Sequence, residues 1–278
     1  MSKYDLSWNE EKYNKKIKEG RGQGTGDDYK PWLTIHDFPS NGIVSRSPGW
    51  KSNRVYHFMS TNELRYFYIL EWSDVINDIR EQFPLELEGT LSIAEELGIK
   101  HPMDNVSKFP RVLTTDFMIT AQVSGKEVYL ARTIKPVKEI ESMRTLEKFE
   151  IERIYWQRKG IDWKLVTDKD ISKIFASNVQ WLHTAYKLES MENLSLQYQL
   201  DICETLKYKL AEYDCPITHI TSKLDEEANV ESGTSLRLFK HLLAIKAVIM
   251  DMEKKINGDC STRDIIDIVY NDTMVKSL

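Results

Sequence analysis

Apolar positions gather in short strand-like segments in the first part of the chain. Five such segments end at turn residues or at a helix-like run, and their lengths are typical of strands: residues 53–59, 75–84, 112–119, 127–134 and 161–168. Residues 60–72 and 139–160 instead have helical spacing, and residues 86–102 form a helical or loop connection. The order helix, strand, strand, helix, strand predicts an α/β domain whose mixed sheet is flanked by helices.

The pattern changes after Asp168. From residue 170 to residue 255 the chain shows helical segments only, punctuated by Pro216 and Gly233. We therefore predict two domains, residues 1–168 and residues 169–278, the second mainly α-helical. Short helices with small connections favour a winged-helix-like or helix-turn-helix module, although a helical bundle gives the same pattern.

The N-terminal stretch is polar, and glycines alternate with other residues from Gly20 to Gly26. No Gly-Lys-Ser/Thr follows, so it is not a P-loop. We predict an extended arm or loop. Its cations are candidates for phosphate contacts, with a solvated surface as the alternative: Lys15, Lys16, Lys18 and Arg21.

Charge does not indicate a nucleic-acid partner. The 278 residues carry a net charge of −5; residues 1–168 hold 25 Lys and Arg against 26 Asp and Glu, and residues 169–278 hold 13 against 17. A local patch or a partner would have to supply the attraction to DNA. The three cysteines are widely spaced, and neither a signal peptide nor an apolar membrane span is apparent. These features predict a cytoplasmic protein without disulfides.

The turn Ser124-Gly125 predicts a hairpin between residues 112–119 and 127–134. In that register Val123 faces Lys126 and Asp116 lies opposite Thr133. Lys135 follows two residues later and points to the same face. Asp116 and Lys135 would then share one end of the sheet, unless the register slips by one residue.

A carboxylate and a lysine at such a position suit a Mg²⁺-dependent nuclease, because Mg²⁺ prefers oxygen ligands and a lysine can orient or deprotonate the attacking water. The PD-(D/E)xK nucleases use this arrangement, and the Ile134 carbonyl can supply another ligand.

These nucleases carry a second acidic residue at the position that Thr133 occupies in this chain, so the site needs another carboxylate. Glu63 is the candidate, since it shares a helical face with Phe67 and Leu70. The alternatives are a surface ion pair for Asp116 and Lys135, and helix capping by Ser60 for Glu63.

Several longer stretches resemble the TnsA family, the endonuclease subunits of heteromeric cut-and-paste transposases. They include IKEGRGQGTGDDYKPWLT, NELRYFYILEW, VINDIREQFPL, TTDFMI, TIKP and RTLEKFEIERIYW. The resemblance implies a restriction-endonuclease-like N-terminal domain and a winged-helix-like C-terminal domain. It also implies a catalytic triad, which matches Glu63, Asp116 and Lys135. The family usually has Gln where this chain has Thr133.

The resemblance further implies cutting of the 5′ ends of a transposon, with Mg²⁺ as cofactor and Mn²⁺ as a substitute. A partner transposase, TnsB, would recognise the end DNA and cut the 3′ ends, and an ATP-dependent regulator, TnsC, would license cutting. The acidic C-terminal domain would dock partners. Two other functions stay open: a non-catalytic assembly subunit, favoured by the loss of Gln at Thr133, and a stand-alone nuclease of the same fold. Arg80, Glu81 and Gln82 are predicted to orient strand and helix, with contact to the site as the alternative.

Overall fold

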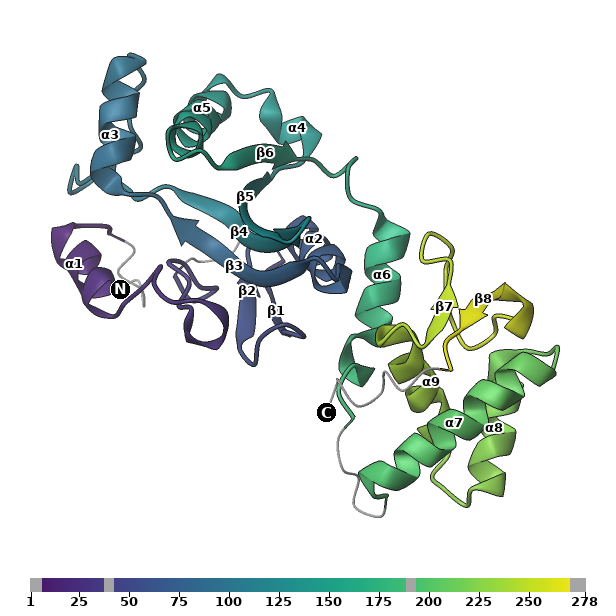
Figure 1. Cartoon of the computed structure of the whole chain (residues 1–278). Helices are drawn as coiled ribbons and strands as arrows, with labels where there is room; N and C mark the ends of the chain where they lie inside the picture. The colour runs from purple at the N-terminus through teal and green to yellow at the C-terminus, as the bar shows by residue number, and fades with distance from the viewer. Residues whose placement is uncertain (1–6, 38–42, 189–193, 271–278) are drawn as a thin grey trace. The chain divides into compact units, whose positions relative to one another are not determined.

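The computed structural model describes residues 7–37, 43–188 and 194–270. It divides into two compact units, Met1–Ile171 and Ser172–Leu278, and Figure 1 shows the elements of each. The pattern of the sequence places the boundary at residues 168 and 169. Each unit has its own buried apolar residues, and the site described below lies within the first.

The first unit is built on a four-stranded sheet with the order β3-β4-β5-β6. Its strands are β3 (Ile76–Pro84), β4 (Thr114–Val123), β5 (Lys126–Ile134) and β6 (Asp162–Val166). The β3–β4 and β4–β5 pairs are antiparallel, whereas β5 and β6 are parallel. The parallel pair requires a crossover, which helices α4 (Val137–Ile140) and α5 (Met143–Arg158) provide. This confirms the predicted mixed α/β sheet.

Helices and a hairpin cover the sheet. Helices α3 (Leu87–Glu96) and α5 lie on one side, and the hairpin of β1 (Ser45–Pro48) and β2 (Val55–Phe58) lies on the other (Figure 1). The α5 side buries a cluster that includes Met118, Ala131 and Trp156. On the hairpin side, Phe67 of α2 (Thr61–Trp72) packs 4.8 Å from Phe58, measured between ring centroids. Both faces of the sheet are therefore buried, which fixes the strand ends that carry the site.

The β4–β5 register is the one that the turn predicted. Val123 pairs with Lys126 and Phe117 pairs with Arg132. Gly125 adopts φ +76° and Ser124 adopts φ +50°, as a tight turn with two left-handed residues requires. The ladder ends at Phe117, and beyond it the Ile134 N–H donates to the Asp116 side chain at 2.7 Å.

The prediction of an extended N-terminal arm is wrong for its first part, because residues Glu10–Lys18 form helix α1. The Asn9 side chain caps the helix by accepting from the Lys12 N–H, and acidic residues occupy the first turn with lysines in the last. These charges complement the helix dipole. The glycine-rich segment that follows contains one 3₁₀ turn, Gly26–Asp28.

Gly22 carries the tightest constraint in this segment. Its φ is +77°, and an added Cβ would lie 2.2 Å from Pro84 Cγ. Gly20 has a similar φ of +72° but open space around it. We expect Gly22→Ala to lower the free energy of unfolding by about 2 kcal/mol or more, and Gly20→Ala by about 1 kcal/mol. Urea unfolding of both variants measures the difference, and equal losses would contradict the assigned contact with Pro84.

The second unit has helices α6 (Lys173–Leu182), α7 (Leu196–Glu212), α8 (Ile217–Glu227) and α9 (Thr234–Ala244), with short 3₁₀ turns at His183–Ala185 and Thr262–Asp264. A two-stranded antiparallel sheet of β7 (Val248–Met250) and β8 (Ile265–Ile268) completes it. The unit is mostly helical, as predicted, and the winged-helix assignment stays a prediction. Across the described parts of both units, no helix is long and apolar enough to cross a membrane.

The prediction of helices only between residues 170 and 255 is wrong at β7. Helix α9 ends at Ala244, and Lys246 then adopts φ +61°. The Ala247 N–H donates to the Leu242 carbonyl, and the Lys246 N–H donates to the Leu243 carbonyl. This is the Schellman pattern that closes helices. Glycine usually occupies the left-handed position at such a helix end. Because Lys246 occupies it here, no signal in the sequence indicated that the helix ends.

Candidate active site

Glu63 lies in the first turn of α2, where it contacts the capping residue Ser60 and also lines a cleft. The Ser60 hydroxyl accepts from the Glu63 N–H at 3.2 Å, and Glu63 Oε2 accepts from the Met59 N–H at 2.9 Å. Ser60 Oγ also donates to Glu63 Oε1 at 2.8 Å. Capping of α2 is thus confirmed. Capping alone does not describe the residue, because Glu63 is only 6% exposed and lines the main cleft of the unit.

Asp116 lies near the start of β4 and is fixed from two sides. Its Oδ2 accepts from the Ile134 N–H of the neighbouring strand at 2.7 Å, and its Oδ1 accepts from Gln82 Nε2 at 3.2 Å. The same Gln82 nitrogen lies 3.4 Å from Glu63 Oε2. One amide group therefore bridges the two carboxylates that the sequence analysis selected, so tertiary structure brings Glu63 and Asp116 together.

Gln82 belongs to the site, in agreement with the alternative rather than with the first interpretation of its segment. It is 3% exposed and adopts φ +49° between Glu81, which pairs with Phe117, and Phe83, which pairs with Thr115. Its carbonyl accepts from the Trp32 N–H at 3.2 Å. Such a backbone conformation costs about 1–3 kcal/mol in a non-glycine residue and occurs often at functional sites. It directs the amide of Gln82 toward the carboxylates.

Glu152 is a further carboxylate of the site, which the sequence analysis did not select. It lies on α5, is 5% exposed, and its Oε1 accepts from the Thr115 and Thr133 hydroxyls at 2.5 Å each. A signal was present in the sequence. Glu152 precedes Tyr155 and Trp156 by three and four residues, so it shares a helical face with buried aromatic residues.

Thr133 has a defined partner at the position where an acidic residue or Gln was expected. Its hydroxyl donates to Glu152 and accepts from Trp163 Nε1 at 3.1 Å. The side chain is 5% exposed. Thr133 therefore positions a carboxylate that comes from a helix, instead of presenting one of its own.

Lys135 lines the same cleft as Glu63, Asp116 and Glu152. Its Nζ forms an ion pair with Glu139 Oε2 at 2.9 Å, one helical turn later in the chain. Within the described residues no ion pair joins Lys135 to Asp116, so the alternative of a simple surface pair between them is not found. The side chain remains 35% exposed at the mouth of the cleft. Burial raises the pKa values of Glu63 and Asp116, and the charge of Lys135 offsets a small part of that rise.

The cleft has a volume of about 1010 Å³. Its floor carries the carboxylates, and its walls come from α1, the segment between α1 and β1, the 102–114 connection, the end of β5 and α5. Burial raises the pKa of all three carboxyl groups, to about 7 for Glu152 and about 8 for Glu63, where the charge of Asp116 adds to the effect of burial. Burial likewise raises the pKa of Asp116 to about 6. Carboxylates held in this way favour either a proton or a cation nearby.

The donor set fits a small divalent cation that keeps several waters. In the described residues, no three acidic, histidine or cysteine side chains converge closely enough to hold a metal by themselves. Two carboxylates bridged by one amide, with a strand end beside them, match the few protein oxygens that Mg²⁺ requires. In the part of the chain that the structure describes, no Lys or Arg side chain forms an ion pair with Glu63 or Asp116, so no protein cation neutralises these two carboxylates by direct contact.

Other buried polar residues of the first unit have partners outside this constellation. His101 bonds Thr90 through Nε2 at 3.1 Å, a contact that ties the 101–111 loop to α3. Glu81 forms an ion pair with Arg54 at 2.7 Å, and Arg80 donates to Thr120 at 2.9 Å. These pairs hold β3 against the β1–β2 hairpin and against β4, whereas the first interpretation of that segment predicted contacts between a strand and a helix.

Comparisons with known proteins show the family of the chain. A family profile described as "TnsA-like endonuclease N terminal" matches residues 73–168, and one described as "TnsA endonuclease C terminal" matches residues 170–252. The chain is 38% identical over 244 residues to "Transposon Tn7 transposition protein TnsA" of Escherichia coli, which covers 88% of this chain and 87% of that protein. On this evidence the chain belongs to the TnsA family of transposition endonucleases.

Proposed function

We propose that this chain is the metal-dependent endonuclease that cuts the 5′ ends of a transposon during cut-and-paste transposition. The observation that carries the proposal is the Gln82 amide that bridges Glu63 and Asp116, with Lys135 on the same cleft. A carboxylate and a lysine at the ends of neighbouring strands, with a second carboxylate from helix α2, are the groups that PD-(D/E)xK chemistry needs. The family to which the chain belongs supports the same reaction.

Each residue has a proposed role in phosphodiester hydrolysis. Glu63 and Asp116 hold a Mg²⁺ ion, with Mn²⁺ as a substitute, and the Ile134 carbonyl is a further ligand. When bound, the ion would neutralise phosphate charge and favour a hydroxide nucleophile. Lys135 orients the attacking water and takes up or shares its proton. Gln82 keeps the two carboxylates in place, and Thr115 and Thr133 hold Glu152 beside them.

The partners of the reaction follow from the family rather than from the site. We propose that TnsB recognises the transposon ends and cuts their 3′ strands, and that TnsC licenses the cut made by this chain. The C-terminal domain predicted from the sequence, residues 169–278, is acidic, with 13 Lys and Arg against 17 Asp and Glu, and it suits protein docking better than insertion into a DNA groove.

The test is strand-specific cutting of a donor plasmid that carries the cognate ends. The reaction contains TnsB, TnsC, ATP, a targeting factor and Mg²⁺, and either the wild-type chain or Asp116→Ala. We expect the variant to lose the nicks at the 5′ ends while the 3′ cuts remain. Identical nicks with both proteins would assign the cut to another subunit and leave this chain a role in assembly.

A further inference from the structure

Seven cations line the cleft, and most are already held by the protein: Lys12, Lys15, Lys16, Arg21, Arg111, Lys135 and Lys148. Lys12 donates to the Ser7 carbonyl, and Lys16 pairs with Asp37 at 2.7 Å. Arg21, Arg111 and Lys135 pair with Glu19, Asp104 and Glu139 respectively. Within the described residues neither Lys15 nor Lys148 forms an ion pair or a side-chain hydrogen bond, although both are exposed to solvent on the cleft wall.

Lys148 lies near other positively charged side chains, which disfavour its charged form. It precedes Glu152 by four residues on α5, so it stands one helical turn away on the same face. Partial burial of its side chain against the cleft wall, and then the charges of Arg144, Lys135 and Arg111, lower its pKa. A lysine surrounded by other cations gains from an anion that neutralises several of them together.

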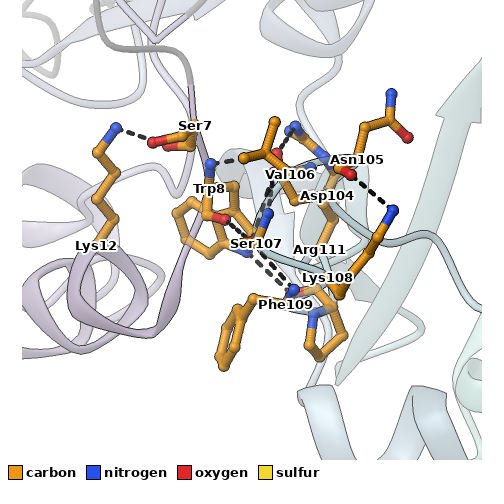
Figure 2. Close-up of polar contacts among 11 residues, drawn as sticks. Ser7, Trp8, Lys12, Asp104, Asn105, Val106, Ser107, Lys108, Phe109 and Arg111 are labelled. Atoms are coloured by element: carbon orange, nitrogen blue, oxygen red, sulfur yellow. Dashed lines mark hydrogen bonds and ion pairs between the residues drawn. The ribbon is translucent and has the colours of Figure 1, made fainter.

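Lys15 lies on another wall of the cleft, on helix α1. The position of this helix is fixed by the contacts in Figure 2. Asp104 of the 102–114 connection accepts from the Trp8 N–H at 3.2 Å, and Trp8 Nε1 donates to the Pro110 carbonyl at 2.9 Å. Backbone N–H groups of Ser107 and Val106 are the main reason why the pKa of Asp104 falls to about 2, so the carboxylate stays charged at any working pH. Contacts with the 102–114 connection therefore hold the start of helix α1, and with it Lys15, in a defined position.

The three carboxylates on the floor repel a phosphodiester, and a bound cation offsets only part of that repulsion. A DNA strand that crosses the floor also carries phosphates on each side of the bond to be cut. Unpaired cations on two walls of the cleft are suited to receive them, because phosphate contacts position a protein on DNA without reading its sequence. The chain as a whole is acidic, with a net charge of −5, so such attraction has to be local.

We infer that Lys15 and Lys148 bind DNA backbone phosphates on either side of the scissile one, and so set which bond lies over Glu63 and Asp116. This rests on the proposed nuclease function. It selects Lys15 from the candidates in the N-terminal stretch, sets aside Lys18, which does not line the cleft, and adds Lys148, which no motif indicated.

The experiment pairs each lysine with single phosphates. End DNA is prepared with one neutral methylphosphonate at each position within about five nucleotides of the 5′ cut, and cutting is measured in the complete transposase reaction. The chain is wild type, Lys148→Ala or Lys15→Ala. The controls are Lys138→Ala and Lys18→Ala, two exposed lysines that lie outside the cleft lining.

We expect one or two methylphosphonate positions to slow wild-type cutting about fivefold to tenfold, and the same positions to slow the matching lysine variant less than about twofold, because its partner is already gone. The control variants should keep the wild-type sensitivity. If lysine and phosphate effects multiply independently at every position, or if no position slows the wild type, the inference is wrong. Retention of the 5′ nicks by Asp116→Ala would instead contradict the proposed function.

Discussion

An Asp116→Asn variant is expected to cut the 5′ strand about a thousandfold more slowly than the wild type, or slower still. The substitution keeps the shape of the side chain and removes its charge. It also puts an amide where Oδ2 accepts from Ile134 and Oδ1 accepts from Gln82. The site would lose a metal ligand and gain a donor that faces other donors.

The Asp116→Asn/Lys135→Ala double variant should be no slower than the slower single variant, within about threefold. Both residues would act on the same water and the same phosphate, so removal of one leaves little for the other to do. Single-turnover rates of end cutting measure this, and Lys138→Ala on α4 serves as the control. Rates that fall independently, with multiplying factors, would show that Lys135 acts outside the reaction that Asp116 supports.

The second large effect concerns stability against pH. Burial raises the pKa of Glu63, Asp116 and Glu152 above their ordinary values. For such groups the folded state binds protons more tightly than the unfolded state. Their contribution to stability is full below the unfolded pKa and is lost as pH rises through the folded pKa. In a chelating buffer, the free energy of unfolding of the first unit should therefore fall from about pH 4.5 to about pH 8.

Glu152→Gln isolates one part of this dependence. The pKa of Glu152 rises from 4.5 to about 7, which corresponds to on the order of 3 kcal/mol between those two pH values. The neutral amide can still accept from Thr115 and Thr133 without that penalty. Thermal unfolding at several pH values should give a flatter profile for the variant, by several degrees near pH 8. A profile as steep as that of the wild type would mean that Glu152 titrates normally in the folded protein.

A divalent metal ion should reduce this loss of stability at high pH. An ion between Glu63 and Asp116 favours their charged forms, so addition of Mg²⁺ is expected to raise the unfolding temperature more at about pH 8 than at about pH 5. Asp116→Asn is the control and should lose most of this response. A response of equal size in that variant would place the metal effect elsewhere in the chain.

Local patterns in the sequence were sufficient for much of the first unit. Alternation and turn residues determine β3 to β6, and the Ser124-Gly125 turn sets the register that places Asp116 beside the end of β5. The capping sequence at Ser60 starts α2 and so places Glu63. These features depend on contacts between residues that are near one another in the chain or joined by a single turn.

Only the tertiary structure decided how the site is completed. Gln82 reaches Glu63 and Asp116 because its backbone adopts a left-handed conformation that Trp32 supports from a distant segment. Glu152 reaches the site because the crossover places α5 over Thr115 and Thr133. The helical spacing of Glu152 indicates that it is buried, but no pattern in the sequence names its partners or those of Gln82, because only the packing of helix and sheet brings these residues within hydrogen-bond distance.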